Sequence, residues 1–422
     1  MVAMVKSDEN DMSPSRFILL LVIAAVSPCS AADPLYEIDL TVARQGFDKK
    51  MCWVHARAGA IPGEGKTQPV AVMTLQKLML SGSDVFYALN EMRSTDGGVT
   101  WTEPKEHDSF ARQPFAYDGK EGLEMTVCDF TPAWHEKTGK LLGTGHTAMY
   151  EDNKVMDVRP RLTPYSVYDP EKQSWSKWKT IKMPEDAKFG NSGAGSVQRY
   201  DLPNGDILLP IYYKEVVAKQ YFVTVLRCSF DGVKLKYVEH GNEMTVPVER
   251  GLVEPSIAHL KGRYYLTLRN DQSGYVAVSS DGLEFSEPKK WAFDDGELLG
   301  NYNTQQHWVP HSDALFLVYT RKGANNDHVM RHRAPLFIAR IDPDKLQVIR
   351  DSEQVLVPEK GARLGNFGVT QFSENETWVT VTEWMQTIGP KYNDPEKLIK
   401  LGADNRVWVA KVKWNKPNGE FR

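Results

Sequence analysis

The sequence of 422 residues is poor in cysteine and carries no strong net charge. It contains four cysteines, and its formal net charge at pH 7 is -4. A charge so close to zero gives no electrostatic reason to expect nucleic acid or a membrane surface as a partner. Metal-binding spacings such as CxxC and HExxH are also missing, so the sequence predicts neither a metal site nor a cofactor.

Long apolar runs are missing as well, apart from one near the N-terminus. Residues 17–26 (FILLLVIAAV) follow Arg16 and precede small residues suited to cleavage before Asp33. This run is shorter than the roughly 20 residues that span a bilayer, so we interpret residues 1–32 as a signal peptide. Residues 8–11 are acidic, which suggests Met12 as the true start. The sequence thus predicts a secreted or periplasmic protein without a membrane span.

Three cysteines remain in residues 33–422, and an odd number argues against a disulfide framework. What these residues do contain is a repeat of short strands. An apolar strand, a polar turn and a second apolar strand begin near residues 69, 130, 194, 253, 304 and 367. A second strand pair around an Asp- or Gly-centred turn follows in most units. Repeats of about four strands are typical of propeller blades, which stack in a ring to bury both faces.

We therefore predict an all-β, six-bladed β-propeller that forms a single domain over residues 33–422. The last strand, near residues 407–414, needs a partner, and residues 36–42 are predicted to pair with it and close the ring. A pair of β-sandwiches is the competing interpretation. It would explain neither the order nor the regularity of the half-units.

One turn carries a recognisable motif. Residues 94–101 (STDGGVTW) match the Asp-box pattern, and residues 279–285 and 229–235 are weaker copies in the same half of their units. The chain therefore resembles the sialidase (neuraminidase) superfamily of Asp-box propellers over nearly all of residues 33–422. The resemblance implies a six-bladed propeller whose funnel holds an arginine cluster, an Asp acid/base and a Tyr nucleophile assisted by Glu. Asp boxes hold turns on the rim, so we expect no catalytic role for them.

The resemblance also implies roles for single residues. Residues 252–255 (LVEP), followed by residues 262–265 (GRYY) and Arg269, are similar to the Glu-bearing blade of the family. Glu254 is then the expected base or nucleophile activator. Asp84 precedes the strand that leads into the first Asp box, where the family has its acid/base Asp.

Two positions depart from the family pattern. The Arg-Ile-Pro of the first blade appears here as residues 60–62 (AIP), so Arg57 is the expected substitute for the missing arginine. The last blade should supply the nucleophilic tyrosine, but residues 365–369 (GNFGV) contain none. Sialic acid specificity and a tyrosine mechanism therefore do not follow from the resemblance.

Charged and polar residues adjoin the ends of apolar strands in every unit, and a propeller brings such ends to one mouth. Buried charges require partners or a water-filled cavity, so we predict a polar funnel. Arg269 and Arg321 occupy equivalent places and present planar forks suited to a carboxylate. The predicted substrate-binding residues are Arg57, Asp129, His146, Tyr212, Arg269 and Arg321, with His307, Glu383 and the basic cluster at residues 331–333 as further candidates.

Three functions are compatible with this pattern. The first is a glycoside hydrolase of sialidase type that acts on a terminal acidic sugar, sialic or uronic, of a glycan. Asp84 would be its general acid/base and Glu254 its base or activator, and water would attack directly. The second is a polysaccharide lyase in which an arginine neutralises a uronate while His146 and Tyr212 exchange protons. The third is a non-catalytic propeller that binds acidic carbohydrate. The sequence does not give the oligomeric state.

Overall fold

Apolar residues that alternate with polar ones, divided by short turns, form strands throughout the chain from Leu35 onward. The computed structural model describes residues 35–65, 67–80, 84–387 and 394–420. The predicted signal peptide, residues 1–32, and the suggested start at Met12 lie outside this described part. None of the described helices has the length and apolarity needed to cross a membrane.

The strands form six sheets, which correspond to the predicted repeat units. Each sheet is given from its innermost strand outward. The first sheet contains β2 (Met51–Ile61), β3 (Val70–Met79), β4 (Phe86–Ser94) and β5 (Lys105–Glu106). The second contains β7 (Lys120–His135), β8 (Lys140–Glu151), β10 (Pro164–Asp169) and β11 (Ser174–Trp175), with β6 (Gln113–Tyr117), β9 (Lys154–Val155) and β12 (Lys179–Thr180) alongside, and the third contains β13 (Asn191–Gly193), β15 (Ile207–Lys214), β16 (Phe222–Phe230) and β17 (Leu235–His240), with β14 (Tyr200–Asp201) alongside. The fourth sheet contains β18 (Val253–Leu260), β19 (Arg263–Arg269), β20 (Gly274–Ser279) and β21 (Lys289–Lys290). The fifth contains β22 (His307–His311), β23 (Ala314–Tyr319), β24 (Leu336–Asp342) and β25 (Gln347–Val348), with β26 (Gln354–Val357) alongside. The sixth contains β27 (Phe367–Ser373), β28 (Glu376–Thr382), β29 (Val407–Trp414) and β1 (Tyr36–Arg44).

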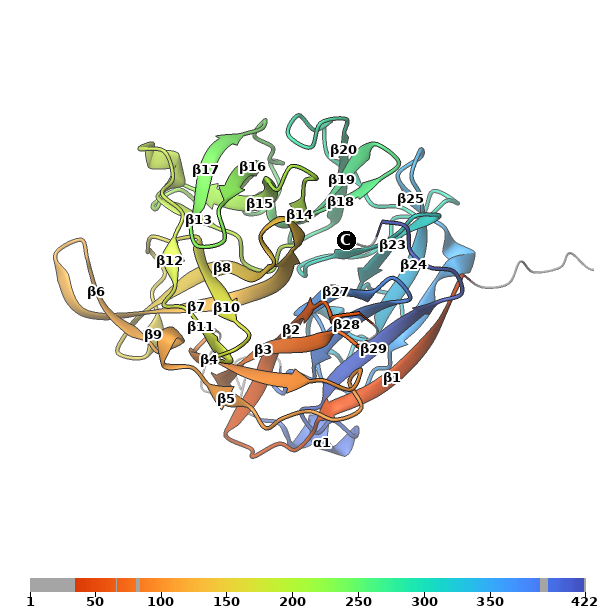
Figure 1. The fold of residues 1–422 in the computed structure, drawn as a ribbon, viewed down its shortest axis with the longest axis horizontal. Helices are drawn as coiled ribbons and strands as arrows, with labels where there is room; N and C mark the ends of the chain where they lie inside the picture. Colours follow the sequence, from red (N-terminus) through yellow and green to blue (C-terminus); the bar gives the residue numbers. More distant parts are fainter. Residues whose placement is uncertain (1–34, 66, 81–83, 388–393, 421–422) are drawn as a thin grey trace, which may run out of the picture. The chain divides into compact units, whose positions relative to one another are not determined.

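The sheets are arranged around a common centre (Figure 1). Strand β2 contacts β7 on one side and β27 on the other, β15 contacts β18, and β22 contacts both β18 and β27. Strands β8 and β13 join the remaining pair of sheets. These contacts complete a ring, so the predicted all-β propeller is confirmed.

The ring is closed by the two ends of the described chain. Strand β1 pairs antiparallel with β29, in a register that runs from Tyr36 opposite Trp414 to Arg44 opposite Val407. The ring of Tyr36 packs edge-on against Phe316, with 5.2 Å between centroids, and so ties this sheet to its neighbour. The predicted closure by residues 36–42 is therefore confirmed.

Neighbouring sheets pack face to face through large apolar side chains. Trp308 of β22 is fully buried, and its ring centroid lies 5.7 Å from that of Trp291. Its indole N–H donates to the backbone oxygen of Ser256 in β18. The three cysteines of the described part, Cys52, Cys128 and Cys228, are buried free thiols within this packing. The aromatic residues at the centre of these interfaces are therefore structural.

Candidate active site

The inner strands deliver polar side chains to the centre by one repeated backbone device. One residue in or next to the inner strand of each of five successive blades has a left-handed conformation, with φ between 47° and 57°. A side chain at such a position is re-aimed out of the strand alternation, and the strand pairing slips there in β2, β7 and β18. Strained non-glycine residues of this kind cluster at functional sites. The five residues are His55, Asp129, Ser196, Glu254 and Asn303.

Asp129 is the hub of the first part of the site. Its Oδ1 accepts hydrogen bonds from Nη2 of Arg57 at 3.0 Å and from Oγ of Ser196 at 2.5 Å, and lies 3.4 Å from Nε2 of His55. Burial raises the pKa of the Asp129 carboxyl, but the neighbouring side chains of His55, Arg57, His146 and Ser196 together outweigh this effect and hold the pKa well below its usual value. Asp129 is therefore an ionised, fixed carboxylate rather than a proton donor.

Arg57 has a different role from the expected one. Its side chain has an exposed fraction of 0% and also contacts the backbone oxygen of Phe367 and the amide oxygen of Gln305. A residue enclosed in this way cannot reach a ligand. Arg57 therefore positions Asp129 and joins its own blade to four others, and it does not substitute for the arginine missing at residues 60–62.

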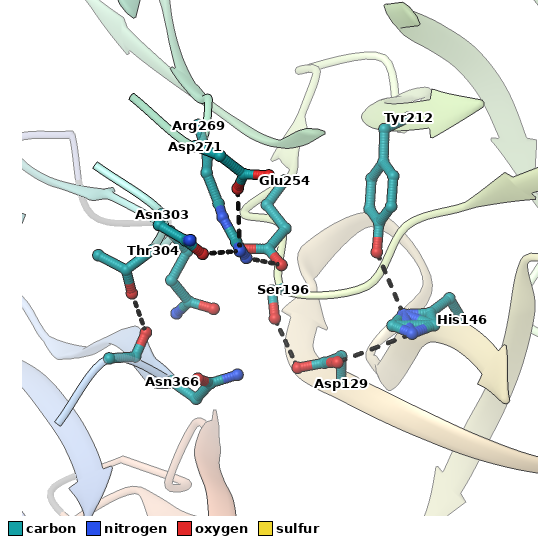
Figure 2. A network of polar contacts seen from close by, with 12 residues as sticks. Asp129, His146, Ser196, Tyr212, Glu254, Arg269, Asp271, Asn303, Thr304 and Asn366 are labelled. Atoms are coloured by element: carbon teal, nitrogen blue, oxygen red, sulfur yellow. Dashed lines mark hydrogen bonds and ion pairs between the residues drawn. The ribbon is translucent and has the colours of Figure 1, made fainter. Parts of the chain in front are cut away.

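A tyrosine and a histidine continue from the other oxygen of Asp129 (Figure 2). Nε2 of His146 lies 3.7 Å from Oδ2 of Asp129, and its Nδ1 lies 3.4 Å from the hydroxyl of Tyr212. Burial lowers the pKa of His146 well below its usual value, so the ring is neutral. Burial likewise raises the pKa of the Tyr212 phenol. Nε2 of His146 also lies 3.2 Å from Sγ of Cys128. Tyr212 and His146 therefore form a pair that can hold and move a proton, with Asp129 close by but beyond hydrogen-bond distance.

Glu254 and Arg269 form the second part of the site (Figure 2). Nη1 of Arg269 lies 2.5 Å from Oε1 of Glu254, and Nη2 donates to the side-chain oxygen of Asn303 at 2.7 Å. Although burial opposes it, the negative charges of Glu254 and Asp271 raise the pKa of Arg269. The carboxylate of Glu254 also acts electrostatically on Tyr212, which links the two parts. Glu254 and Arg269, which were predicted separately as a base and as a substrate-binding residue, therefore form an ion pair in the structure.

Asp84 lies next to this cluster with its side chain exposed. It has a left-handed backbone with φ of 61°, and its backbone oxygen accepts a hydrogen bond from the Tyr150 hydroxyl. Its carboxylate acts electrostatically on His55 and Arg331, so it faces the same mouth. The structure therefore places Asp84 at the edge of the cluster, and its catalytic role stays a prediction.

Three other candidates have structural partners. Both terminal nitrogens of Arg321 contact neighbours, and its Nε and Nη2 grip the carboxylate of Glu353 at 2.8 and 2.6 Å. Arg321 was expected to face the ligand together with Arg269, but its guanidinium is paired with Glu353 instead. His307 bonds to Ser256, and Glu383 caps backbone N–H groups.

The basic cluster predicted at residues 331–333 contributes Arg333 to the site, whereas Ser196, Asn303 and Asn366 were not predicted from the sequence. Arg333, from the basic stretch at residues 331–333, is buried and donates from Nε to the backbone oxygen of Asn303 and from Nη1 to Asn366. The charge of Arg269 acts on Arg333, so two guanidinium groups share this side. Asn303 and Asn366 precede the inner strands of their blades, and that position is the signal that could have identified them, whereas Ser196 follows β13.

Cys128, Asp129 and His146 have the side-chain types of a metal site, and their ligand atoms lie within 4.8 Å of one another. Their surroundings do not suit a divalent cation, because Arg57 contacts Asp129 and the charge of Arg161 acts on His146. We therefore derive no chemistry from a metal here.

A cavity of about 460 Å³ opens at the opposite end of the inner strands. It is lined by Trp134 at the end of β7, His259 near the end of β18 and Arg199, whose guanidinium is paired with Asp201. None of the predicted site residues lines it. The strained residues and the perturbed titratable groups lie at the other end, so we place the candidate active site there.

Comparisons with known proteins support the fold. Neither protein-family models nor curated protein sequences match this chain. Among solved structures, a Dyadobacter fermentans protein of unknown function has a TM-score of 0.60 at 14% identity, over 90% of this chain and all of that one. The Trypanosoma rangeli sialidase has a TM-score of 0.56 at 13% identity, over 89% of this chain, which spans only 59% of that enzyme. The NanB sialidase of Streptococcus pneumoniae has a TM-score of 0.55 at 10% identity, over 90% of this chain and 71% of the enzyme. The chain therefore has the fold of a sialidase-like β-propeller.

Proposed function

We propose that this protein is a glycoside hydrolase of sialidase type, which removes a terminal acidic sugar from a glycan. The observation that carries the proposal is the convergence of Glu254 and Arg269 with Tyr212, His146 and Asp129, which come from three different blades. The T. rangeli sialidase has been solved with sialic acid bound, which is consistent with an acidic sugar as ligand of this fold.

Binding of the sugar carboxylate falls to the guanidinium groups. Arg269 and Arg333 lie on one side of the cluster, held by Asn303 and Asn366, so their planes are fixed before the ligand arrives. Preorganised cations of this kind orient an anionic substrate and avoid reorganisation during the reaction. A carboxylate that binds Arg269 would compete with Glu254 and release it for chemistry.

Cleavage needs one group that donates a proton to the leaving oxygen and one that acts on the other face of the sugar. Exposed Asp84, at the edge of the cluster, is the proposed general acid. Glu254, once freed from Arg269, is the proposed base for an attacking water. Tyr212 is the one tyrosine of the predicted set, and Glu254 acts on it electrostatically, so it is the alternative acceptor of the sugar.

The test uses a fluorogenic sialoside and a fluorogenic glucuronide with Glu254→Gln and Asp84→Asn. Loss of a positioned acid or base should lower kcat by about 10²- to 10⁴-fold. Glu287→Gln, at an exposed position outside the site, is the matched control and should keep wild-type turnover. Unchanged turnover in both site variants would remove the assignment. Binding of either sugar without any turnover would leave the non-catalytic propeller as the function.

A lyase is the second candidate, and the contact between Tyr212 and neutral His146 favours it. A neutral imidazole can accept the proton α to a uronate carboxylate, while a phenol donates one to the leaving oxygen. A polyuronate probe would then give an unsaturated product that absorbs in the ultraviolet. Its absence with wild type, or its persistence at full rate in Tyr212→Phe, would exclude this mechanism.

Export is part of the proposal, since the evidence for it lies in residues 1–32 outside the described part. Analysis of the mature N-terminus after expression with the full chain would test it. A protein that begins at or near Asp33 and leaves the cytoplasm is the expected result. Retention of residues 13–32 on the mature protein would contradict it.

A further inference from the structure

A second group of cations adjoins the site and is not used by the proposed chemistry. The guanidinium of Arg161 lies 5.0 Å from the ring centroid of Tyr212 and 5.8 Å from that of Tyr221. The ammonium of Lys214 lies 5.0 Å from the Tyr221 centroid. Arg159 acts electrostatically on both Arg161 and Tyr221. Three positive charges therefore surround one aromatic pair at the edge of the Tyr212–His146 chain.

These charges have no carboxylate partners. Among the ion pairs of the described residues, none includes Arg159, Arg161 or Lys214. Arg161 is only 8% exposed, and its Nε is buried without a hydrogen bond in the described part of the chain. The charge of Asp129 acts on Arg161, but that carboxylate forms its ion pair with Arg57 instead. A buried guanidinium without a paired carboxylate is costly, so a purely structural Arg161 would be unfavourable.

Arg199 shows how this chain satisfies a buried arginine that has a structural task. Its Nε and Nη2 contact both oxygens of Asp201, at 2.9 and 3.2 Å. Its Nη1 donates to the backbone oxygen of Leu142 at 2.7 Å. Arg161 is buried as well, but no carboxylate of the described residues forms an ion pair with it. The difference indicates that the counter-charge of Arg161 comes from outside the chain.

The backbone is shaped to hold Arg161 in this place. A Cβ at Gly193 of β13 would lie 2.9 Å from Cδ of Arg161 and 2.6 Å from Cβ of His146. Only a glycine lets the Arg161 stem and the His146 ring lie against the same strand. Arg161 also acts electrostatically on His146 and Tyr212, so a ligand group beside it would lie close to the proton-moving residues.

We propose that Arg159, Arg161 and Lys214 form a second anion subsite, so that the substrate is a glycan with two acidic groups. The first group, a carboxylate, binds Arg269 and Arg333. The second, a sulfate ester or a further carboxylate, binds the cations around Tyr221. The inference rests on the proposed function for the nature of the substrate, but its test is a binding measurement that needs no turnover.

The experiment compares three uronate disaccharides by calorimetric titration: one with a single carboxylate, one that also carries a sulfate ester, and one with two carboxylates. Wild type should bind the two-charge ligands more tightly. Arg161→Gln should weaken binding of those ligands by about 10- to 100-fold, because charge-assisted hydrogen bonds are lost, and should leave the single-carboxylate ligand within about 2-fold. The two-charge ligand whose binding Arg161→Gln weakens more identifies the second acidic group as a sulfate ester or a carboxylate.

Arg350→Gln, which removes an exposed arginine paired with Asp295, is the matched control and should change none of the three affinities. Because Arg161→Gln removes an unpaired buried charge, its Tm should equal or exceed that of wild type. A lowered Tm with equal weakening of all three ligands would show a structural role and overturn the proposal, as would a wild type that binds the three ligands equally. Absence of turnover with intact selective binding would reject only the enzymatic part.

Discussion

Removal of Arg57 gives the sharpest test of how the site is held together. Arg57→Met preserves most of the apolar stem but leaves the Asp129 carboxylate without the guanidinium 3.0 Å away. In this variant His55, His146 and the hydrogen bond from Ser196 remain, and each of them lowers the pKa of Asp129, so we expect the carboxylate to stay ionised. Loss of one partner of a buried ion pair costs about 3–5 kcal/mol, since the other charge is left uncompensated.

That cost can be converted into a melting temperature. The unfolding entropy of about 2.1 cal/mol/K per residue, for the unit that begins at Leu35, makes each degree worth about 0.8 kcal/mol. Arg57→Met should therefore lower Tm by about 4–6 °C if unfolding is two-state. Asp129→Asn, added to Arg57→Met, should recover most of this loss, because asparagine tolerates the left-handed backbone and carries no charge.

The assay is thermal unfolding followed by circular dichroism at pH 7, for wild type, both single variants and the double variant. Arg350→Met, at an exposed pair, should change stability by no more than about 1 kcal/mol and serves as control. The reasoning is refuted if Arg57→Met shifts Tm by less than about 1 °C, or if the double variant is as unstable as Arg57→Met, since either result would mean that the buried charge of Asp129 needs no partner.

Three further predictions concern stability. His307 is 2% exposed and burial lowers its pKa to about 3, so below pH 6.5 the unfolded state binds more protons and stability falls. At pH 5 this costs about 2 kcal/mol, so His307→Gln should reduce the fall in stability between pH 7 and pH 5, measured by urea unfolding, by about that amount; His55 and His146, whose pKa values burial also lowers, keep their share of the fall. A Cβ at Gly195 would lie 1.8 Å from Nδ1 of His146, so Gly195→Ala should lower the free energy of unfolding by about 1–3 kcal/mol. Gly419→Ala, where a Cβ meets no such contact, is the control and should not destabilise the protein. Equal melting curves for the two variants would contradict the prediction. Deletion of residues 36–44 removes β1 and exposes the edge of β29. Tm should therefore fall, and light scattering should detect association through the exposed edge. A monomer with unchanged Tm would show that the ring does not need this closure.

The order of the strands could be predicted from the sequence because it depends on patterns of residues that are close together in the chain. Each blade repeats an apolar strand, a turn and a second apolar strand, and the unpaired strand near residues 407–414 pointed to residues 36–42 as its partner. Glu254 and Arg269 could be paired for a similar reason. They stand at the two ends of one hairpin, so the antiparallel register of β18 and β19 brings them together.

The partners of residues from different blades could not be predicted in this way. Arg321 and Arg269 have equivalent places in the sequence, yet Glu353 from a later turn neutralises Arg321, while Asn303 and Glu254 hold Arg269 at the centre. The left-handed residues are equally hidden, because His, Asp, Ser, Glu and Asn share no pattern that distinguishes five such positions.

By itself the sequence determined an all-β repeat and the hairpin that carries Glu254, since each depends on residues close together in the chain. The leader at residues 1–32 stays a prediction. Only the closed ring decided that Arg57 is enclosed, that Asp129 is a fixed charge, and that Arg161 has no counter-ion among the described residues. These properties depend on which groups meet across blades, and the energy of a buried charge is set by its neighbours in space rather than by its place in the chain.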